Sequence, residues 1–316
     1  MHIIPMIREF VPIIGTPLEP EGDFLRFKGG KVADASQPGV EREAMGLYIS
    51  KQTFSGGSIS ARFTFTQLGG RQSADIIAFY DPQVSATLNA GIPPDVSFLC
   101  VCAYEPPKWN YIAQTGDHST ALVAGKEYHL EVSLRGSEIS LRCNGVEAVR
   151  AVLPRQYPPS QIGLFFISEH DIKFSDFSAT PRRSRAFVIS QFSSPYNEVY
   201  MEVIKSVCQD LEVEVIRADE AQGPGLIIAD VVRSINDASF VIADISPVNA
   251  NVFYELGYAH GVRKPAILIA ERTTKLPFDV SPFRTLFYDN TIAGKPRLEK
   301  GLAEAIRAVL GRSNEC

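Results

Sequence analysis

The sequence contains few tryptophans and cysteines and no long apolar run. Its 316 residues include one tryptophan and five cysteines, and no stretch approaches the roughly 20 apolar residues of a membrane-spanning helix. The start, MHIIPMIREF, carries an early proline and glutamate and does not match a signal peptide. These absences predict a cytoplasmic protein without membrane contacts.

The cysteines also lack the spacing of a metal site or of a disulfide framework. Cys100 and Cys102 alternate along a predicted strand, so they should point to one face as small apolar residues. The others, Cys143, Cys208 and Cys316, are isolated in the sequence. We therefore expect neither a bound metal nor a structural disulfide.

No charge of one sign dominates the chain. The formal net charge is -5 with acids and bases interspersed, which excludes a broad basic surface for nucleic acid or for an anionic membrane. A small phosphate-bearing ligand remains compatible with this balance. The hydrophobic content of 45% and the length of 316 residues predict a globular protein of two domains, each able to bury a core.

The first half of the chain has the texture of an all-β sandwich. Short alternating segments separated by turn residues run from about Gly46 to Ala179. Two of them, 59–65 and 128–134, place apolar residues on one face and polar residues on the other. The dipeptide Asn144-Gly145 between alternating runs predicts a hairpin with a type I′ turn.

This order of hairpins, with the late pair "IGLFF…IKFSDF", resembles the concanavalin A-like (laminin G-like) jelly roll of lectins and carbohydrate-binding modules. The resemblance covers about Leu25 to Thr180 and implies a domain over 1–180 that acts as a sensor, a ligand module or an oligomerisation module. A carbohydrate or protein ligand is therefore expected. Its aromatic residues are either a sugar platform or core and rim residues. They are Tyr104, Trp109, Tyr111 and His118.

The second half alternates between strands and helices. It follows a short basic segment, Pro181 to Arg185, which we interpret as a solvated linker. Five apolar runs predict parallel strands: 186–190, 213–217, 240–243, 266–270 and 285–288. With the helices between them they predict a domain over 186–316 with a flavodoxin-like parallel sheet of order 2-1-3-4-5. One helix should begin with Ser194 as cap, and in another Ile228 should face inward.

The stretch from Phe240 to Ile269 is the centre of this half. A buried strand ends at Asp244, a polar loop follows, and a helix then carries Glu255. If Asn251 caps this helix, Glu255 lies in its first turn, where the helix dipole favours an ionised carboxylate. Two carboxylates at a strand end suit chemistry at an electron-poor sugar carbon. The alternative is that Glu255 is only a helix N-terminal charge and Asp244 only a loop cap.

The string FVISQF…ADIS…NANVFYELGYAHG…KPAILI resembles the nucleoside 2-deoxyribosyltransferase-like and TIR-like superfamily over about Ala186 to Leu310. The resemblance implies that Glu255 in YELGYA is the nucleophile or the oxocarbenium stabiliser, and that Asp244 handles the base. It also implies substrate contacts from the first-strand loop and from polar residues near the helix start. Together with other loop positions, the expected substrate-binding residues are Ser190, Gln191, Phe192, Asp219, Ser246, Asn249 and Asn251.

The chain departs from both branches of this superfamily just before Glu255. Asn249 to Asn251 stand where the transferases have an additional acid, and the Ser and Trp-Cys pair of TIR enzymes are replaced. Three hypotheses follow. The first is cleavage of an N-glycosidic bond of a nucleotide, NAD⁺ preferred, by a regulated, defence-type effector that is expected to form a homo-oligomer. The second is a nucleoside deoxyribosyltransferase or hydrolase of salvage metabolism, and the third is a non-catalytic nucleotide-binding signalling module. No cofactor is expected, because NAD⁺ would be the substrate.

Overall fold

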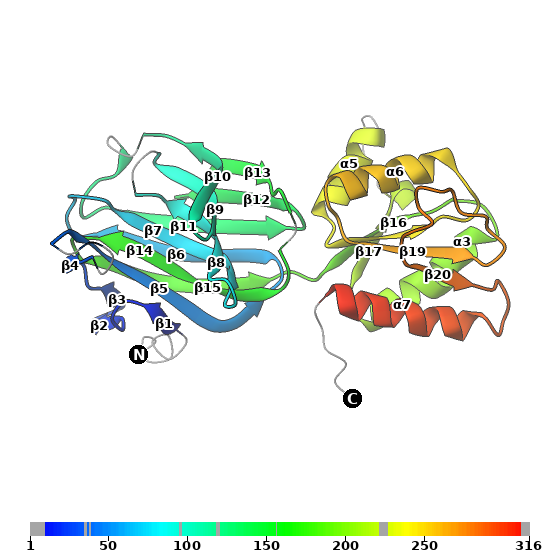
Figure 1. The fold of residues 1–316 in the computed structure, drawn as a ribbon, viewed down its shortest axis with the longest axis horizontal. Coiled ribbons are helices and arrows are strands. Elements are labelled where there is room, and N and C mark those ends of the chain that lie inside the picture. Colours follow the sequence, from blue (N-terminus) through cyan, green and yellow to red (C-terminus); the bar gives the residue numbers. More distant parts are fainter. Residues whose placement is uncertain are drawn as a thin grey trace. The chain divides into compact units, whose positions relative to one another are not determined.

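The chain forms two compact units (Figure 1). The computed structural model describes residues 10–34, 37, 39–94, 97–117, 121–155, 157–220 and 227–310, so His118 and Cys316 lie outside the described residues. The first unit comprises Met1–Leu134, Ile139–Ala151 and Pro159–Arg182. The second comprises Arg135–Glu138, Val152–Pro158 and Arg183–Cys316, so two short segments from the β-rich half group with the C-terminal half.

The first unit consists of two antiparallel sheets, of eight and seven strands. The first follows the order β1-β5-β14-β7-β8-β9-β10, with β4 paired to β5, and the second the order β13-β12-β11-β6-β15-β3-β2. The strands of the eight-stranded sheet are β1 (Phe10–Ile14), β4 (Lys31–Ala33), β5 (Glu41–Phe54), β7 (Ser73–Asp81), β8 (Ala86–Ile92), β9 (Leu99–Glu105), β10 (Lys108–Thr115) and β14 (Ser160–Ser168). Those of the seven-stranded sheet are β2 (Glu19–Glu21), β3 (Phe24–Phe27), β6 (Gly57–Phe65), β11 (Glu127–Arg135), β12 (Glu138–Cys143), β13 (Val146–Val152) and β15 (Ile172–Pro181).

Aromatic residues from both sheets form the core between them. Phe166 on β14 lies 5.9 Å from Phe63 on β6 and 5.7 Å from Phe174 on β15, measured between ring centroids. The alternation predicted along 59–65 is confirmed, because every second residue of β6 is buried. The antiparallel β sandwich expected from the sequence is therefore present.

The predicted Asn144-Gly145 hairpin is also confirmed. Both residues have positive φ, 51° for Asn144 and 81° for Gly145, as a type I′ turn requires. The Asn144 side-chain oxygen accepts a hydrogen bond from the His129 backbone N–H at 2.8 Å, which links the turn to β11. Cys100 and Cys102 of β9 are both buried free thiols.

The second unit is built on a parallel five-stranded sheet of order β17-β16-β18-β19-β20, which is the order 2-1-3-4-5 expected from the sequence. Its strands are β16 (Arg185–Ile189), β17 (Glu214–Arg217), β18 (Phe240–Asp244), β19 (Ala266–Glu271) and β20 (Thr285–Tyr288). Its helical segments are α3 (Tyr196–Val199), the π-helical turn η1 (Tyr200–Ile204), α4 (Lys205–Asp210), the 3₁₀ turn η2 (Ala218–Glu220), α5 (Ile227–Asp237), α6 (Ala250–Gly261) and α7 (Lys295–Val309).

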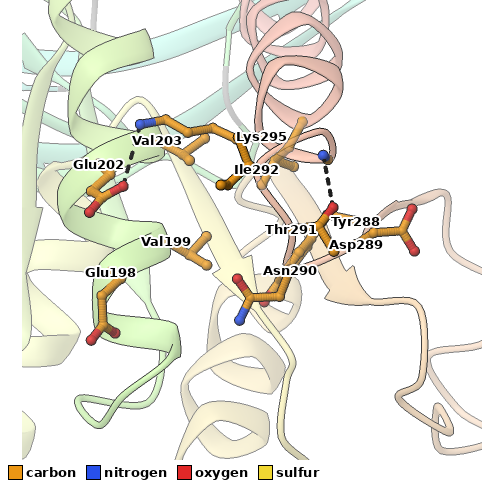
Figure 2. A pocket seen from close by; sticks show the side chains of 12 residues that line it. Glu198, Val199, Glu202, Val203, Tyr288, Asp289, Asn290, Thr291, Ile292 and Lys295 are labelled. Carbon is orange, nitrogen blue, oxygen red and sulfur yellow. Dashed lines mark hydrogen bonds and ion pairs between the residues drawn. The ribbon is translucent and has the colours of Figure 1, made fainter.

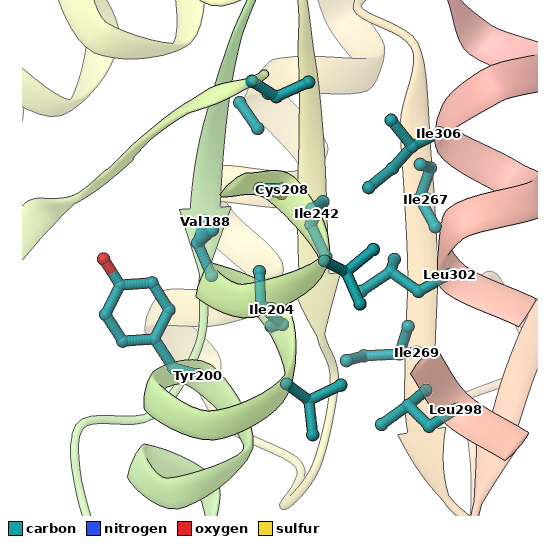
Figure 3. Close-up of a cluster of buried hydrophobic side chains, with 14 of the residues drawn as sticks. Val188, Tyr200, Ile204, Cys208, Ile242, Ile267, Ile269, Leu298, Leu302 and Ile306 are labelled. Atoms are coloured by element: carbon teal, nitrogen blue, oxygen red, sulfur yellow. The ribbon is translucent and has the colours of Figure 1, made fainter. Parts of the chain in front are cut away.

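Side chains of alternate parity on each strand pack on opposite faces of this sheet. Ile242 of β18 joins a core with Ile204 and Leu302 on the face covered by α3, η1, α4 and α7, here called the α7 face (Figure 3). Its neighbour Val241 joins a second core on the face covered by α5 and α6, here called the α6 face. This alternation decides which face each residue at a strand end belongs to.

Two local predictions about the start of this unit are wrong. Arg185 is not part of a solvated linker, because its guanidinium pairs with Glu214 Oε1 at 2.8 Å and with Asp237. The first helix has Pro195 rather than Ser194 at its N-cap, without a side-chain capping bond. The prediction for Arg185 failed because its partners are distant in the sequence, whereas the local composition alone is typical of a solvated segment.

Two classes of feature are missing from the described part of the chain. None of its helices is both long enough and apolar enough to cross a bilayer. Nor do three or more His, Cys, Asp or Glu side chains come together there in an arrangement that would hold a metal ion.

Candidate active site

A pocket of about 380 Å³ lies at the carboxyl-terminal edge of the parallel sheet, on the α6 face, and contains Glu255. The residues that follow β16 form one wall, and the start of α6 forms another, as expected for adjacent strands of this order. Ile228 and Val231 of α5 contribute apolar surface. The complete lining of this Glu255 pocket is Ser190, Gln191, Phe192, Ala218, Ile228, Val231, Asn249, Asn251, Val252, Tyr254 and Glu255. Six of the nine residues that the sequence nominated therefore line one pocket.

Asn249, and not Asn251, caps helix α6. Asn249 is extended, with φ -135° and ψ 127°, and its side chain accepts a hydrogen bond from the Asn251 backbone N–H at 2.9 Å. The helix therefore starts at Ala250, two residues before the predicted start. Glu255 consequently lies in the second turn, beyond the first turn in which the helix dipole acts most strongly.

The Glu255 carboxyl is half-buried, and burial raises its pKa from 4.5 to about 7. No described residue donates a hydrogen bond to it or pairs with it. The expected stabilisation of its ionised form by the helix dipole is thus outweighed by loss of water. A carboxyl group that titrates near neutral pH without a fixed partner is available to a ligand.

Polar side chains next to Glu255 form a short hydrogen-bonded chain. The Asn249 amide donates to Gln191 Oε1 at 3.1 Å, and the Gln191 amide donates to Ser193 Oγ at 2.7 Å. Ser190 Oγ is buried and has no partner among the described residues. The pocket therefore offers a hydroxyl whose hydrogen-bonding capacity is unused.

Phe192 forms part of the pocket wall and is held from behind by Arg217. The Arg217 guanidinium lies 4.9 Å from the Phe192 ring centroid and 3.9 Å from that of Tyr200. Asp219 accepts two hydrogen bonds from the same guanidinium, both of 2.7 Å. Arg217 is only 4% exposed, whereas Phe192 is 52% exposed. A buried guanidinium that makes cation–π contacts with both rings holds the exposed ring of Phe192 in place. Asp219 thus binds Arg217 and does not line the Glu255 pocket.

Asp244 and Ser246 also lie outside the pocket lining. Asp244 has the same strand parity as Ile242 and points to the α7 face, where Tyr288 donates to its Oδ2 at 2.8 Å. Its Oδ1 accepts from the Ser246 backbone N–H at 3.0 Å, and burial raises its pKa to about 7. Ser246 Oγ accepts from the Glu271 backbone N–H at 2.6 Å. The roles assigned to Asp244 and Ser246 in catalysis and binding stay predictions.

A second pocket, of about 550 Å³, lies on the other side of the sheet between α3 with η1 and the segment after β20 (Figure 2). Lys295 faces Glu202 across it at 3.4 Å, and Thr291 Oγ1 accepts from the Gly294 backbone N–H at 3.1 Å. Tyr288, the partner of Asp244, lines it. It contains none of the nominated site residues, so we assign the candidate active site to the Glu255 pocket.

The sequence interpretation missed three features of the site. Ile228, predicted to face inward, is 43% exposed and lines the Glu255 pocket. Tyr254 lines it as well and is 60% exposed. The sequence did carry a signal for Tyr254, because an aromatic residue directly next to the nominated Glu255 is a candidate for the pocket lining. The Arg217 stack had no such signal, because it joins three separate segments of the chain.

Comparisons with known proteins yield fold-level likenesses alone. No family model and no curated protein matches the sequence. The carbohydrate-binding module CBM66 from Bacillus subtilis is similar in structure, with 13% identity and a TM-score of 0.42 over 54% of this chain and 93% of that one. The laminarinase catalytic domain from Thermotoga maritima has 10% identity and a TM-score of 0.39 over 54% and 92%. The TIR domain of the Toll-related receptor TRR-2 from Hydra magnipapillata has 15% identity and a TM-score of 0.33 over 39% and 97%. At such identities and scores these likenesses assign no activity.

Proposed function

We propose that the second unit cleaves the N-glycosidic bond of a nucleotide-type substrate, preferably NAD⁺, with Glu255 as the catalytic carboxylate. The observation that carries the proposal is a half-buried glutamate, unpaired among the described residues, in a pocket of about 380 Å³. This volume falls within the range of small-molecule pockets, about 300 to 1,000 Å³.

The composition of the pocket favours NAD⁺ over nucleosides. Glu255 is the only acid among its described lining residues, so no second acid stands ready to protonate a departing base. Adenine, guanine and cytosine leave more easily when protonated, whereas nicotinamide leaves a pyridinium as a neutral molecule. A pocket with a single carboxyl group therefore suits the pyridinium substrate.

For this reaction the protein has to supply a negative charge next to the sugar carbon and little else. When the bond between ribose C1′ and the pyridinium nitrogen breaks, its electron pair stays with nitrogen. The ionised Glu255 carboxylate then stabilises the positive charge on C1′ or attacks that carbon. Addition of water at C1′ and loss of one proton give ADP-ribose. The Ser190 hydroxyl and the Asn251 amide supply hydrogen bonds to the substrate, and Phe192 and Tyr254 supply flat apolar surface.

The β sandwich fits the role of a regulatory module in this proposal. A ligand-binding unit fused to a glycosidase unit is the arrangement of a regulated, defence-type effector, with a homo-oligomer as the assembled state. This step rests on domain architecture and not on the chemistry of the pocket.

The test is product analysis with the full chain. Wild-type protein and Glu255→Gln are incubated with NAD⁺ and, separately, with a panel of nucleosides and nucleotides, and the products are separated by chromatography. We expect nicotinamide and ADP-ribose from NAD⁺ with the wild type and a loss of at least about 100-fold with Glu255→Gln. Glu198→Gln, an exposed acid on α3, serves as the matched control and should keep wild-type turnover.

Three outcomes would replace the proposal. Full turnover by folded Glu255→Gln would exclude Glu255 as the catalytic group. Consumption of nucleosides without NAD⁺ would favour the salvage enzyme. Saturable NAD⁺ binding without turnover, also after addition of ligands of the β sandwich, would favour the non-catalytic module.

A further inference from the structure

The eight-stranded sheet of the first unit contains a third ligand-sized pocket, here called the sandwich pocket. Its volume is about 670 Å³, and it lies on the face of the sheet opposite the core between the sheets. Every residue of β8, and all of β7 except Asp81, is buried, so both faces of these two strands are covered. This differs from the usual antiparallel sheet, which has one solvated face.

Buried polar residues gather on this outer face around Asp75. Asp75 is 2% exposed and lines the sandwich pocket. Its Oδ2 accepts hydrogen bonds from Ser73 Oγ at 3.0 Å and from the Asn89 amide at 3.3 Å. Its Oδ1 and the Asn89 Oδ1 are buried and have no partner among the described residues. Both unsatisfied atoms are acceptors, so hydrogen-bond donors are what this face lacks.

The walls of the sandwich pocket are mainly apolar and aromatic. The Trp109 ring lies 4.8 Å from Tyr104 and 5.8 Å from Phe165, measured between centroids, so the three rings form a continuous surface. Such rings attract a cation through their faces, and a nearby carboxylate adds to this attraction. A sugar would bring several hydroxyl groups, yet Ser73 and the Asn89 amide already donate to Asp75.

We propose that the sandwich pocket binds a small organic amine, with its ammonium group directed to the Asp75 carboxyl and its apolar body packed on Tyr104, Trp109 and Phe165. Ammonium is all donor and no acceptor, which matches the unsatisfied Oδ1 of Asp75, the one of the two residues that lines the pocket. A ligand with an apolar body and a single polar group matches the sandwich pocket, whose mainly apolar walls contain one buried carboxyl group. This site is independent of Glu255 and of the proposed glycosidase activity.

The other charges around the pocket leave Asp75 as its only acid among the described lining residues. Arg71 lines the exposed rim, and its backbone N–H donates to the Glu43 carboxylate at 3.1 Å. On β9, contact with Cys102 and burial raise the pKa of the Cys100 thiol, so this group stays neutral near pH 7. The remaining titratable side chains of the lining are Cys102, Tyr104 and Tyr111.

The single tryptophan makes the test direct, because Trp109 lies in the sandwich pocket and no other tryptophan contributes to the emission. The full chain is titrated at constant ionic strength with phenethylammonium, with its neutral counterpart 2-phenylethanol, and with cellobiose. We expect a saturable change in Trp109 emission with phenethylammonium at a Kd at least about tenfold lower than for 2-phenylethanol. Burial raises the pKa of Asp75 to about 7, so binding of the cation should be about tenfold tighter at pH 8 than at pH 6.

Two variants test whether binding of the amine depends on the Asp75 carboxyl group. Asp75→Asn keeps the shape of the side chain and should lose at least about tenfold in affinity for phenethylammonium. Asp81→Asn, at the end of the same strand and outside the pocket lining, should bind as the wild type does. Equal affinity for the amine and the alcohol, tighter amine binding at pH 6, or saturation by cellobiose alone would overturn the proposal. These comparisons use the wild-type protein, so they decide the matter even where Asp75→Asn fails to fold.

Discussion

Replacing Glu255 by glutamine should stabilise the second unit while it removes activity. Burial raises the pKa of Glu255 from 4.5 to about 7, so the folded chain holds this proton more tightly than the unfolded chain. The free energy of unfolding therefore falls as pH rises from about 4.5 to about 7, and the full cost of the charge is present above pH 7. Glutamine has nearly the same shape and does not ionise, so it avoids this cost.

The size of the effect follows from the same values. A carboxyl group with a pKa of about 7 instead of 4.5 costs about 3 kcal/mol to ionise in the folded state. Glu255 is half-buried, and screening by solvent reduces this to about 1–2 kcal/mol. The gain of Glu255→Gln should therefore be about 1–2 kcal/mol at pH 8 and only about a quarter of that at pH 5.

Urea unfolding at both pH values measures this difference. Far-UV circular dichroism follows the second unit, which contains α3 to α7, while Trp109 emission follows the first. The exposed Glu198→Gln should shift neither transition. Equal effects of Glu255→Gln at pH 5 and pH 8, or a loss of stability at pH 8, would refute the argument from burial. In the wild type, NAD⁺ cleavage should rise with pH through about 7, because the ionised carboxylate is the active form.

Three further variants test neighbouring contacts. Asp244→Asn should leave NAD⁺ turnover within about threefold, because the side chain points to the α7 face and binds Tyr288; a loss comparable to that of Glu255→Gln, in steady-state kinetics, would contradict this placement. Arg217→Met should destabilise the second unit by about 1–2 kcal/mol, since it removes the cation that pairs with the exposed Asp219 carboxylate and contacts the rings of Phe192 and Tyr200; an unchanged urea midpoint would contradict it. Asn249→Ala should cost about 1 kcal/mol through loss of the α6 cap, which a thermal melt measures, and an unaltered melting temperature would show that the cap contributes nothing.

The pattern of apolar residues was enough to predict the parallel sheet of the second unit and the β-sandwich class of the first. The five parallel strands and their order follow from short apolar runs separated by helical spacing, because strand parity and right-handed crossovers leave few arrangements. The type I′ turn at Asn144-Gly145 was readable because it needs two residues with positive φ. Both signals are local in the sequence, so the sequence alone is enough to predict these elements.

The candidate site was predicted less completely, because its details depend on contacts distant in the sequence. Asn249 and Asn251 are both good caps, and only the backbone angles show that Asn249 is the one used. The spacing of apolar residues along α5 does not show that Ile228 faces the Glu255 pocket rather than the core. Asp75 occupies an ordinary alternating position on β7, and its burial arises from segments that cover the outer face of the sheet.

The guanidinium of Arg217 fixes where the side chain of residue 192 lies, whichever flat side chain occupies that position. Because the ring of Phe192 rests on a cation that is itself fixed by Asp219 and Tyr200, any flat side chain at position 192 can be held in the same plane. Tyrosine, tryptophan or histidine would add a different hydrogen-bonding edge to the pocket without a new backbone conformation. A substitution at position 192 can therefore change the hydrogen-bonding edge of the Glu255 pocket while the supporting stack stays the same.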